Sequence, residues 1–131
     1  MAAKKVSPII LVVEDERTLN EAYQIILRKN GYTVHTAYDG EEALQVAAQH
    51  EPTLILLDMR MPRLDGIGFL RRYNLLKNHP RVKVVIFSNY DMQKVIDEAY
   101  RLCVAHYILK AWASPKGLLQ VVKHTLAQAV G

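Results

Sequence analysis

Short apolar or β-branched runs alternate with longer segments of helical periodicity along this chain, and that alternation limits the fold more than any other feature. Five runs have the length of strands, at 8–13, 32–37, 53–57, 82–87 and 105–109. Helical segments follow them from about 16 to 30, from the cap at Asp39 to Pro52, from Gly66 towards Pro80, from about 92 to 102, and from Ser114 onward. Strands that alternate with helices form a parallel sheet covered on both faces. The sequence therefore predicts an α/β fold, a doubly wound five-stranded parallel sheet with five helices.

The size and composition fit one globular domain. A chain of 131 residues can bury one core but has little left for a second, and half of its residues are apolar. We expect a single domain over 1–131, with its core at about 7–129 and no output domain. No apolar run approaches the roughly 20 residues that span a bilayer, and the basic N-terminus runs into Pro8 and Glu14, unlike a signal peptide. A cytoplasmic location is expected, and the single cysteine, Cys103, fits it because no internal disulfide can form.

Seven basic residues gather in one stretch of the sequence, in which Asp65 is the only acid. They are Arg60, Arg63, Arg71, Arg72, Lys77, Arg81 and Lys83. The chain has a net charge of +4, so this stretch should give one side of the domain a positive field. A solvated surface is the leading interpretation, because charge alone is weak evidence for nucleic acid binding, which we do not expect. An acidic protein partner stays open.

Charged and polar residues mark the ends of four predicted strands. Glu14 and Asp15 follow the first, Asp58 the third and Lys110 the fifth, while the fourth ends at Ser88. Because the carboxyl ends of parallel strands share one edge, these side chains should meet in a single crevice. Neighbouring carboxylates repel one another unless a cation or retained protons offset their charge. Magnesium prefers such oxygen ligands and keeps coordination positions for phosphate oxygens, so the sequence predicts a magnesium site.

Lys110 and Ser88 extend this set of residues towards phosphate chemistry. The lysine adds a positive charge, and the serine adds a hydroxyl that can donate to a phosphoryl oxygen. Phosphoryl transfer depends on positioning and charge neutralisation, so a carboxylate nucleophile, a metal, a lysine and a hydroxyl suffice. Taken singly, each residue has an ordinary structural explanation, since strand-end acids often cap loops. Their joint position at strand ends favours a phosphoryl-transfer site.

The motifs that contain these residues resemble the response-regulator receiver domain of two-component signalling systems, in its chemotaxis-type single-domain form. The resemblance covers nearly the whole chain and rests on the segments 12–15, 56–62, 65–66, 85–88 and 107–110. The spacing of Asp15, Asp58, Ser88 and Lys110 is close to the usual spacing in the family. The resemblance implies the flavodoxin-like receiver fold, with strand order 2-1-3-4-5.

Each site residue is given a role by the same resemblance. Asp58 would accept the phosphoryl group, and Lys110 would pair with it. The magnesium ion would be held by Asp15, Glu14, Asp58 and the backbone carbonyl of Arg60. Asp15 is expected to be a direct side-chain ligand, ahead of Glu14.

Ser88 is similar to the switch hydroxyl of the family, and Tyr107 to the aromatic residue that turns inward when the hydroxyl moves. Family members receive their phosphoryl group from a histidine kinase or a histidine phosphotransfer protein. The resemblance thus implies a signal receiver, able to catalyse its own phosphorylation and dephosphorylation, and not a turnover enzyme. Its output would be a changed partner-binding face of the fourth helix, fifth strand and fifth helix. A homodimer stays open, and neither a further cofactor nor membrane contact is expected.

Three positions depart from the family pattern in ways that affect the backbone or the core. Ala111 replaces the proline that commonly follows the lysine, often after a cis bond. A cis bond without proline costs about 2.5–4 kcal/mol, so we expect a trans bond with a shifted loop or a strained cis bond. Cys103 stands where the family commonly has glycine, and we expect a strained backbone there. Trp112 is expected to pack into the core.

Access to the pocket should also differ from that of relatives. The residue after the switch hydroxyl is usually very small, but here Asn89 is followed by Tyr90. Arg60 adds another long side chain at the mouth of the pocket. Our hypothesis is that Arg60 and Tyr90 tune the lifetime of the aspartyl phosphate, and plain solvent exposure is the alternative.

Three other functions compete with the phosphorylation switch. An aspartate-nucleophile phosphatase would also use Asp58 and magnesium, but Arg60 occupies the position where that class needs a second aspartate. A flavin-binding electron carrier can share this fold, although the loop after the first strand is acidic where it should bind phosphate. A receiver-like interaction module that is never phosphorylated is the third, and the complete set of phosphorylation residues argues against it.

Overall fold

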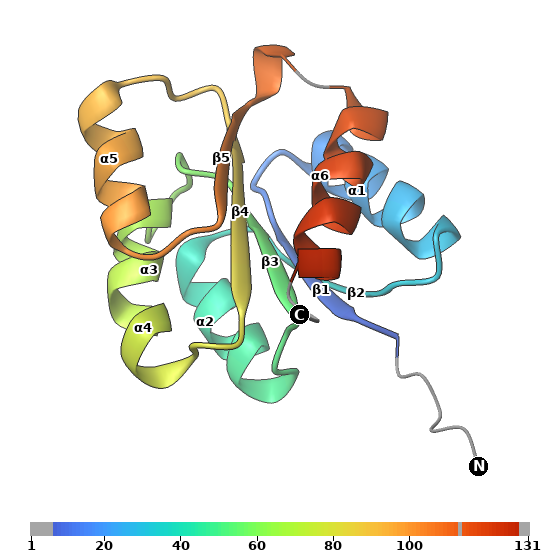
Figure 1. Cartoon of the computed structure of the whole chain (residues 1–131), viewed down its shortest axis with the longest axis horizontal. Helices are drawn as coiled ribbons and strands as arrows, with labels where there is room; N and C mark the ends of the chain where they lie inside the picture. The colour runs from blue at the N-terminus through green and yellow to red at the C-terminus, as the bar shows by residue number, and fades with distance from the viewer. Residues whose placement is uncertain (1–6, 113, 129–131) are drawn as a thin grey trace.

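The computed structural model describes residues 7–112 and 114–128, and its central sheet has helices on both faces (Figure 1). The strands are β1 (Ile9–Val13), β2 (Thr33–Ala37), β3 (Leu54–Leu57), β4 (Lys83–Ser88) and β5 (His106–Leu109). The helices are α1 (Arg17–Lys29), α2 (Gly40–Gln49), α3 (Gly66–Tyr73), α4 (Leu75–Asn78), α5 (Gln93–Arg101) and α6 (Pro115–Gln128), with a 3-10 turn, η1 (Lys110–Trp112), before α6. The side chain of Trp112, for which the sequence predicts packing, lies outside the described part of the chain.

The five strands form one parallel sheet in the order β2-β1-β3-β4-β5, which confirms the predicted fold class and strand order. The register brings the strand ends level with one another. Val13 pairs with Ala37 on one side and with Leu57 on the other, and Ser88 pairs with Leu109. The residues that follow these positions therefore emerge at the same edge of the sheet, which we call the carboxyl edge.

Apolar side chains cover both faces of the sheet because alternate residues of each strand point to opposite sides. Leu11 and Val13 of β1 belong to a core cluster that α2, α3, α4 and α5 cover, whereas Ile10 and Val12 belong to a cluster covered by α1 and α6. Figure 1 shows the two helical layers on opposite sides of the strands. None of the described helices has the length and apolar character needed to cross a membrane.

The backbone is left-handed just after α3, at Asn74, and just after α5, at Cys103. The helical segment predicted from Gly66 towards Pro80 is interrupted at Asn74, whose backbone is left-handed with φ 54°. The side chain of Asn74 then accepts a hydrogen bond from the backbone N–H of Lys77 and begins the one-turn helix α4. Cys103 has φ 74°, so the prediction of a strained backbone at this position is confirmed.

Two aspartates cap the first turns of α2 and α3, the helices before and after β3 in the chain. Asp39 caps α2, as predicted, by accepting from the N–H of Glu42 at 2.8 Å, and Asp65 caps α3 by accepting from Gly68 at 2.8 Å. Next to Asp65, the chain passes very close to the end of β3. A Cβ atom at Gly66 would lie 2.6 Å from the carbonyl oxygen of Asp58, so this approach requires glycine.

Candidate functional site

The backbone at the carboxyl edge holds the two innermost acids in place. Glu14 follows β1, and its N–H donates to the carbonyl of Ala37 at 3.1 Å. Asp58 follows β3, and its N–H donates to the carbonyl of Val13 at 3.0 Å. These bonds continue the parallel pairing beyond the last strand residues, so the positions of both side chains are set by the sheet.

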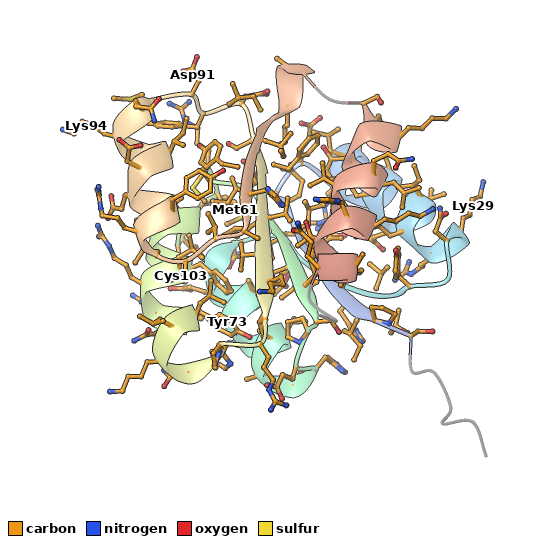
Figure 2. The ribbon with its side chains drawn as sticks, in the orientation of Figure 1. Lys29, Met61, Tyr73, Asp91, Lys94 and Cys103 are labelled. Atoms are coloured by element: carbon orange, nitrogen blue, oxygen red, sulfur yellow. The ribbon has the colours of Figure 1, made fainter. Side chains whose placement is uncertain are left out.

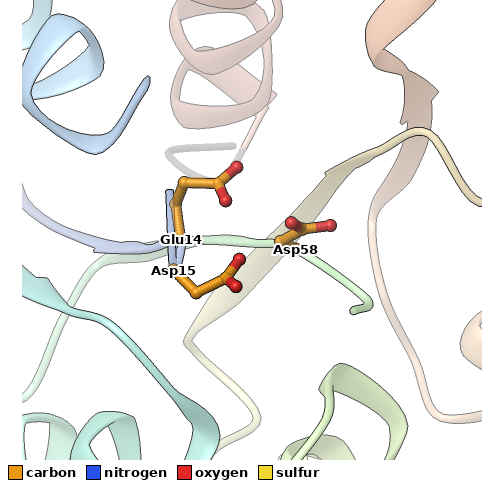
Figure 3. Close-up of side chains that lie close together, drawn as sticks. All are labelled: Glu14, Asp15 and Asp58. Atoms are coloured by element: carbon orange, nitrogen blue, oxygen red, sulfur yellow. The ribbon is translucent and has the colours of Figure 1, made fainter. Parts of the chain in front are cut away.

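Three carboxylates lie close together at this edge (Figure 3). Glu14, Asp15 and Asp58 each offer an oxygen atom, and these oxygens all lie within 4.8 Å of one another. Glu14 is 3% exposed and Asp58 6% exposed, whereas Asp15 is exposed. Within residues 7–112 and 114–128, no other group of three potential metal ligands is this compact. The predicted convergence of these acids is therefore observed.

Lys110 offsets part of this negative charge. Its Nζ atom donates to Glu14 and to Asp58, with 3.2 Å between Nζ and Oδ2 of Asp58. Burial disfavours the ammonium form of Lys110, but the bond to Glu14 and the charge of Asp58 outweigh that effect, so the pKa of Lys110 is raised. Burial, and then the charge of Asp58, raise the pKa of Glu14 to about 7 despite its bond to Lys110. One ammonium group is thus shared by two buried carboxylates.

The carboxylate of Asp58 is oriented by its own loop as well as by Lys110. Its Oδ1 atom accepts a hydrogen bond from the backbone N–H of Met59 at 2.7 Å. The second oxygen, Oδ2, faces Lys110. A cavity of about 630 Å³ opens beside these groups and is bordered by Ser88 and Asp15. Asp58 is therefore fixed in direction and still reachable from this cavity.

The mouth of the cavity is bordered by the long side chains that the sequence predicts there. Arg60, Asn89 and Tyr90 all line it. The guanidinium carbon of Arg60 lies 4.6 Å from the centre of the Tyr90 ring, which is a cation–π arrangement. The two side chains therefore contact each other at the rim, and their effect on the lifetime of an aspartyl phosphate stays a hypothesis.

Ser88 and Tyr107 are connected through the backbone of Tyr90. Ser88 is 1% exposed, and its Oγ atom accepts from the N–H of Tyr90 at 3.1 Å. The hydroxyl of Tyr107 donates to the carbonyl of Tyr90 at 2.6 Å, and burial raises the pKa of Tyr107 to about 12. The backbone N–H of Tyr107 donates to the hydroxyl of Tyr100 at 3.0 Å. A chain of contacts thus runs from the cavity to α5.

The bond between Lys110 and Ala111 is trans, which agrees with one of the two outcomes predicted for a chain without proline there. Lys110 still reaches Asp58 and Glu14 from this backbone. Replacement of the proline by Ala111 therefore leaves the lysine contacts intact.

A comparison with known sequences decides the family. The response regulator receiver domain family matches residues 10–123 of this chain. The chain belongs to this family. Among curated relatives of the receiver domain, the transcriptional regulatory protein HptR of Staphylococcus aureus is 35% identical over 104 residues, which cover 77% of this chain and 40% of HptR. The response regulator MprA of Mycobacterium ulcerans is 48% identical over 63 residues, which cover 48% of this chain and 27% of MprA.

Solved structures share the fold of this chain. A CheY-like receiver domain protein from Methanospirillum hungatei has a TM-score of 0.87 at 24% identity, and the match covers 95% of this chain and 97% of that one. The N-terminal domain of an uncharacterized protein from Wolinella succinogenes has a TM-score of 0.81 at 28% identity, with 90% and 93% covered. The matched residues span about 40% of the length of HptR. The predictions of a single domain without an output domain and of a cytoplasmic location stay predictions.

Two residues that were not predicted from the sequence, Asn20 and Arg63, support the receiver-domain site. Asn20 is fully buried, and its side-chain amide donates to the carbonyls of Glu14 at 2.9 Å and Ala37 at 3.3 Å. A polar residue on the same helical stripe as Tyr23 and Leu27 was the signal for it. Arg63 forms an ion pair with the buried side chain of Asp39 and so ties the loop after β3 to the start of α2. No pattern in the sequence predicts this ion pair between Arg63 and Asp39.

The basic stretch does not lie on one face of the receiver domain. Arg60 and Arg63 belong to the loop after β3, at the carboxyl edge, and contact Tyr90 and Asp39. The other five residues belong to α3, α4, the turn before β4 and the first residue of β4, towards the opposite edge of the sheet. The seven residues therefore do not form one continuous positive side, and a positive side formed by the later five residues alone stays a prediction.

Proposed function

We propose that this receiver domain is a phosphorylation-dependent switch in two-component signalling, in which Asp58 accepts a phosphoryl group. The donor would be the phosphohistidine of a histidine kinase or of a histidine phosphotransfer protein. The observation that carries the proposal is the buried Asp58 carboxylate, which faces a cavity and contacts Lys110 within a cluster of three acids.

Magnesium fits the residues at this edge. Three carboxylates whose oxygens lie within 4.8 Å form a hard, negatively charged donor set, and a single lysine offsets only part of that charge. We propose that Asp15, Glu14, Asp58 and the backbone carbonyl of Arg60 hold the ion. When bound, magnesium would neutralise charge on the oxygens of the transferring phosphoryl group.

In the transfer step, a carboxylate oxygen of Asp58 forms a bond to phosphorus while the bond between phosphorus and the donor's histidine nitrogen breaks. The electron pair of the broken bond goes to that nitrogen, and the donor imidazole takes up a proton from water and leaves as the neutral group. Met59 fixes the direction of the Asp58 carboxylate through its N–H, and Lys110 turns its ammonium group towards the new phosphoryl oxygens. Ser88 is positioned at the cavity to donate its hydroxyl proton to one of these oxygens.

The contacts of Ser88 suggest how phosphorylation would change the partner-binding face. Its Oγ atom accepts a bond from Tyr90 in this structure, so a shift of Ser88 towards a phosphoryl oxygen would remove that bond. The loop at Tyr90 also holds the hydroxyl of Tyr107, which would then be released to turn inward. The face formed by α5, β5 and α6 would change and bind a downstream protein differently; whether it also forms a homodimer stays open.

A small phosphodonor, acetyl phosphate, tests the proposal directly. Wild-type protein incubated with acetyl phosphate and Mg²⁺ should gain the mass of one phosphoryl group, and Asp58→Asn should gain none. Removal of Mg²⁺ by a chelator should also prevent the gain. Asp97→Asn is the matched control, because Asp97 lies on α5 away from the cavity and its loss should change nothing. An unmodified wild type would instead favour the receiver-like module that is never phosphorylated.

A further inference from the structure

The edge of the sheet opposite Asp58 carries an exposed apolar surface. Leu76 of α4 is 75% exposed, more than any other large apolar side chain that the structure describes. It stands between two clefts of about 310 and 210 Å³, and Leu75, Leu76 and Cys103 line both of them. We call Leu75, Leu76, Cys103 and these two clefts the Leu76 surface. Figure 2 places Cys103 on the side of the molecule that faces away from Lys29.

The geometry of the one-turn helix α4 is consistent with the exposure of Leu76. Asn74 begins this single turn, and Leu75 points into the core, where it is 3% exposed. Neighbouring residues of a helix point in directions about 100° apart, so Leu76 points away from the direction that Leu75 takes into the core, and it is 75% exposed. A polar residue at this position would leave the core unchanged. The leucine is therefore available to a partner.

Basic side chains surround this apolar centre. Lys83 lines one cleft, Arg71 and Arg101 line the other, and neither cleft is lined by an acid. Arg71 is paired with Glu98. Within residues 7–112 and 114–128, Lys83 and Arg101 have no ion-pair partner. The charge at the Leu76 surface is therefore positive and only partly neutralised.

We propose that the Leu76 surface binds an acidic protein segment that places an apolar side chain beside Leu76. An apolar centre with a charged rim is the usual arrangement of a protein interface, and the rim selects a partner of opposite charge. Nucleic acid fits less well, because phosphates need a continuous row of cations, whereas here apolar residues form the centre and Glu98 lies beside Arg71. This surface lies away from the cavity at Asp58, so binding should not require phosphorylation and goes beyond the proposed switch.

A synthetic peptide pair provides the test. The acidic peptide carries leucines at helical spacing among glutamates, and its control carries lysine in place of every glutamate. Each is added to the isotope-labelled, unphosphorylated chain, and backbone amide signals are followed by nuclear magnetic resonance. The acidic peptide should shift signals around Leu76, Arg101 and Cys103 and should bind less tightly as salt is added. The lysine peptide should leave these signals in place.

Matched variants distinguish binding at the Leu76 surface from attraction of the acidic peptide to the overall positive charge of the chain. Leu76→Asp and Arg101→Glu should each weaken binding of the acidic peptide by about tenfold. The controls Ile25→Asp and Lys29→Glu make the same changes at exposed positions of α1 and should stay within about twofold of the wild type. Circular dichroism checks that all four variants are folded.

Several results would overturn this inference. Shifts confined to another surface, equal binding of the lysine peptide, or an equal loss in the α1 variants would each do so. Tighter binding of an oligonucleotide, or of phosphatidylglycerol vesicles, to the same residues would assign the surface to nucleic acid or to a membrane instead.

Discussion

The two edges of the sheet carry opposite charges, and they hold them in different ways. At the carboxyl edge, Glu14 and Asp58 are buried and share Lys110, whose side chain is only 13% exposed. At the opposite edge, Arg71 is 62% exposed and Arg101 is exposed without an ion pair among the described residues. Strand ends fix the first set of charges, whereas helix surfaces carry the second. The buried charges at the carboxyl edge should therefore depend on one another, so that a single substitution there changes stability and chemical activity. The exposed charges at the opposite edge should tolerate substitution and stay available to partner proteins.

The largest expected difference between the edges is the effect of removing one basic side chain. Lys110→Met leaves Glu14 and Asp58 buried without their ammonium group, and should lower the free energy of unfolding by about 3 kcal/mol when no divalent cation is present. Added Mg²⁺ should restore part of that loss. Urea unfolding monitored by circular dichroism, with and without Mg²⁺, measures both effects.

Arg101→Met is the matched change at the opposite edge. Arg101 is exposed, so its loss should alter the free energy of unfolding by less than about 0.5 kcal/mol. Equal losses in the Lys110 and Arg101 variants would show that the two edges do not differ in the way described.

A smaller effect is expected at Gly66, which packs under Asp58, the proposed phosphoacceptor. In Gly66→Ala, the new Cβ atom would lie 2.6 Å from the carbonyl oxygen of Asp58 and 2.3 Å from Cε of Met59. The backbone must shift, so we expect a loss of about 2 kcal/mol in unfolding free energy and slower phosphorylation by acetyl phosphate.

Gly68→Ala is the control, because its Cβ atom would mainly meet Cδ1 of Leu64, the far end of a flexible side chain. That side chain can move aside at little cost. If Gly68→Ala slowed phosphorylation as much as Gly66→Ala, close packing under Asp58 would not be the reason.

The Asp39–Arg63 pair should give the carboxyl edge a distinct pH dependence. Burial alone would raise the pKa of Asp39, but bonds from the N–H of Glu42 and from Arg63 outweigh it and hold that pKa below its usual 3.8. The ionised Asp39 therefore adds stability that is fully present above its ordinary pKa and is lost as the pH falls through the lower pKa of the folded state. Arg63→Ala should lower the melting temperature at neutral pH, and the difference from wild type should shrink in strong acid.

Arg71→Ala removes the arginine of a more exposed pair, since Glu98 is 30% exposed whereas Asp39 is 2% exposed. It should change the melting temperature less than Arg63→Ala at every pH. A difference between Arg63→Ala and wild type that persists unchanged in strong acid would exclude Asp39 as its source.

The smallest effect concerns the Arg60–Tyr90 pair at the mouth of the cavity. Both side chains border the space beside Asp58, so Arg60→Ala and Tyr90→Ala should admit water and shorten the half-life of the aspartyl phosphate by about two- to fivefold. The half-life is measured after removal of the phosphodonor. Equal half-lives for both variants and wild type would end this hypothesis.

The residues at the carboxyl edge could be predicted from the sequence, because all strands of a parallel sheet end at the same edge. A residue directly after an apolar run, such as Asp58 or Lys110, must appear at the same edge as the others. The Asp39–Arg63 pair could not be predicted, since it depends on the path of a loop in which Arg63 has φ 66°. The break at Asn74 could not be predicted either, because asparagine occurs both within helices and in the left-handed backbone conformation that the structure shows at this position.

The most direct test of the account asks whether the acids at the carboxyl edge act together on one divalent cation. Mn²⁺ can replace Mg²⁺ and broadens nearby nuclear magnetic resonance signals. We expect trace Mn²⁺ to broaden the amide signals around Asp15, Asp58 and Lys110 first, and Asp15→Asn to need far more Mn²⁺ for the same effect. Broadening centred elsewhere, or unchanged by Asp15→Asn, would contradict the central claim.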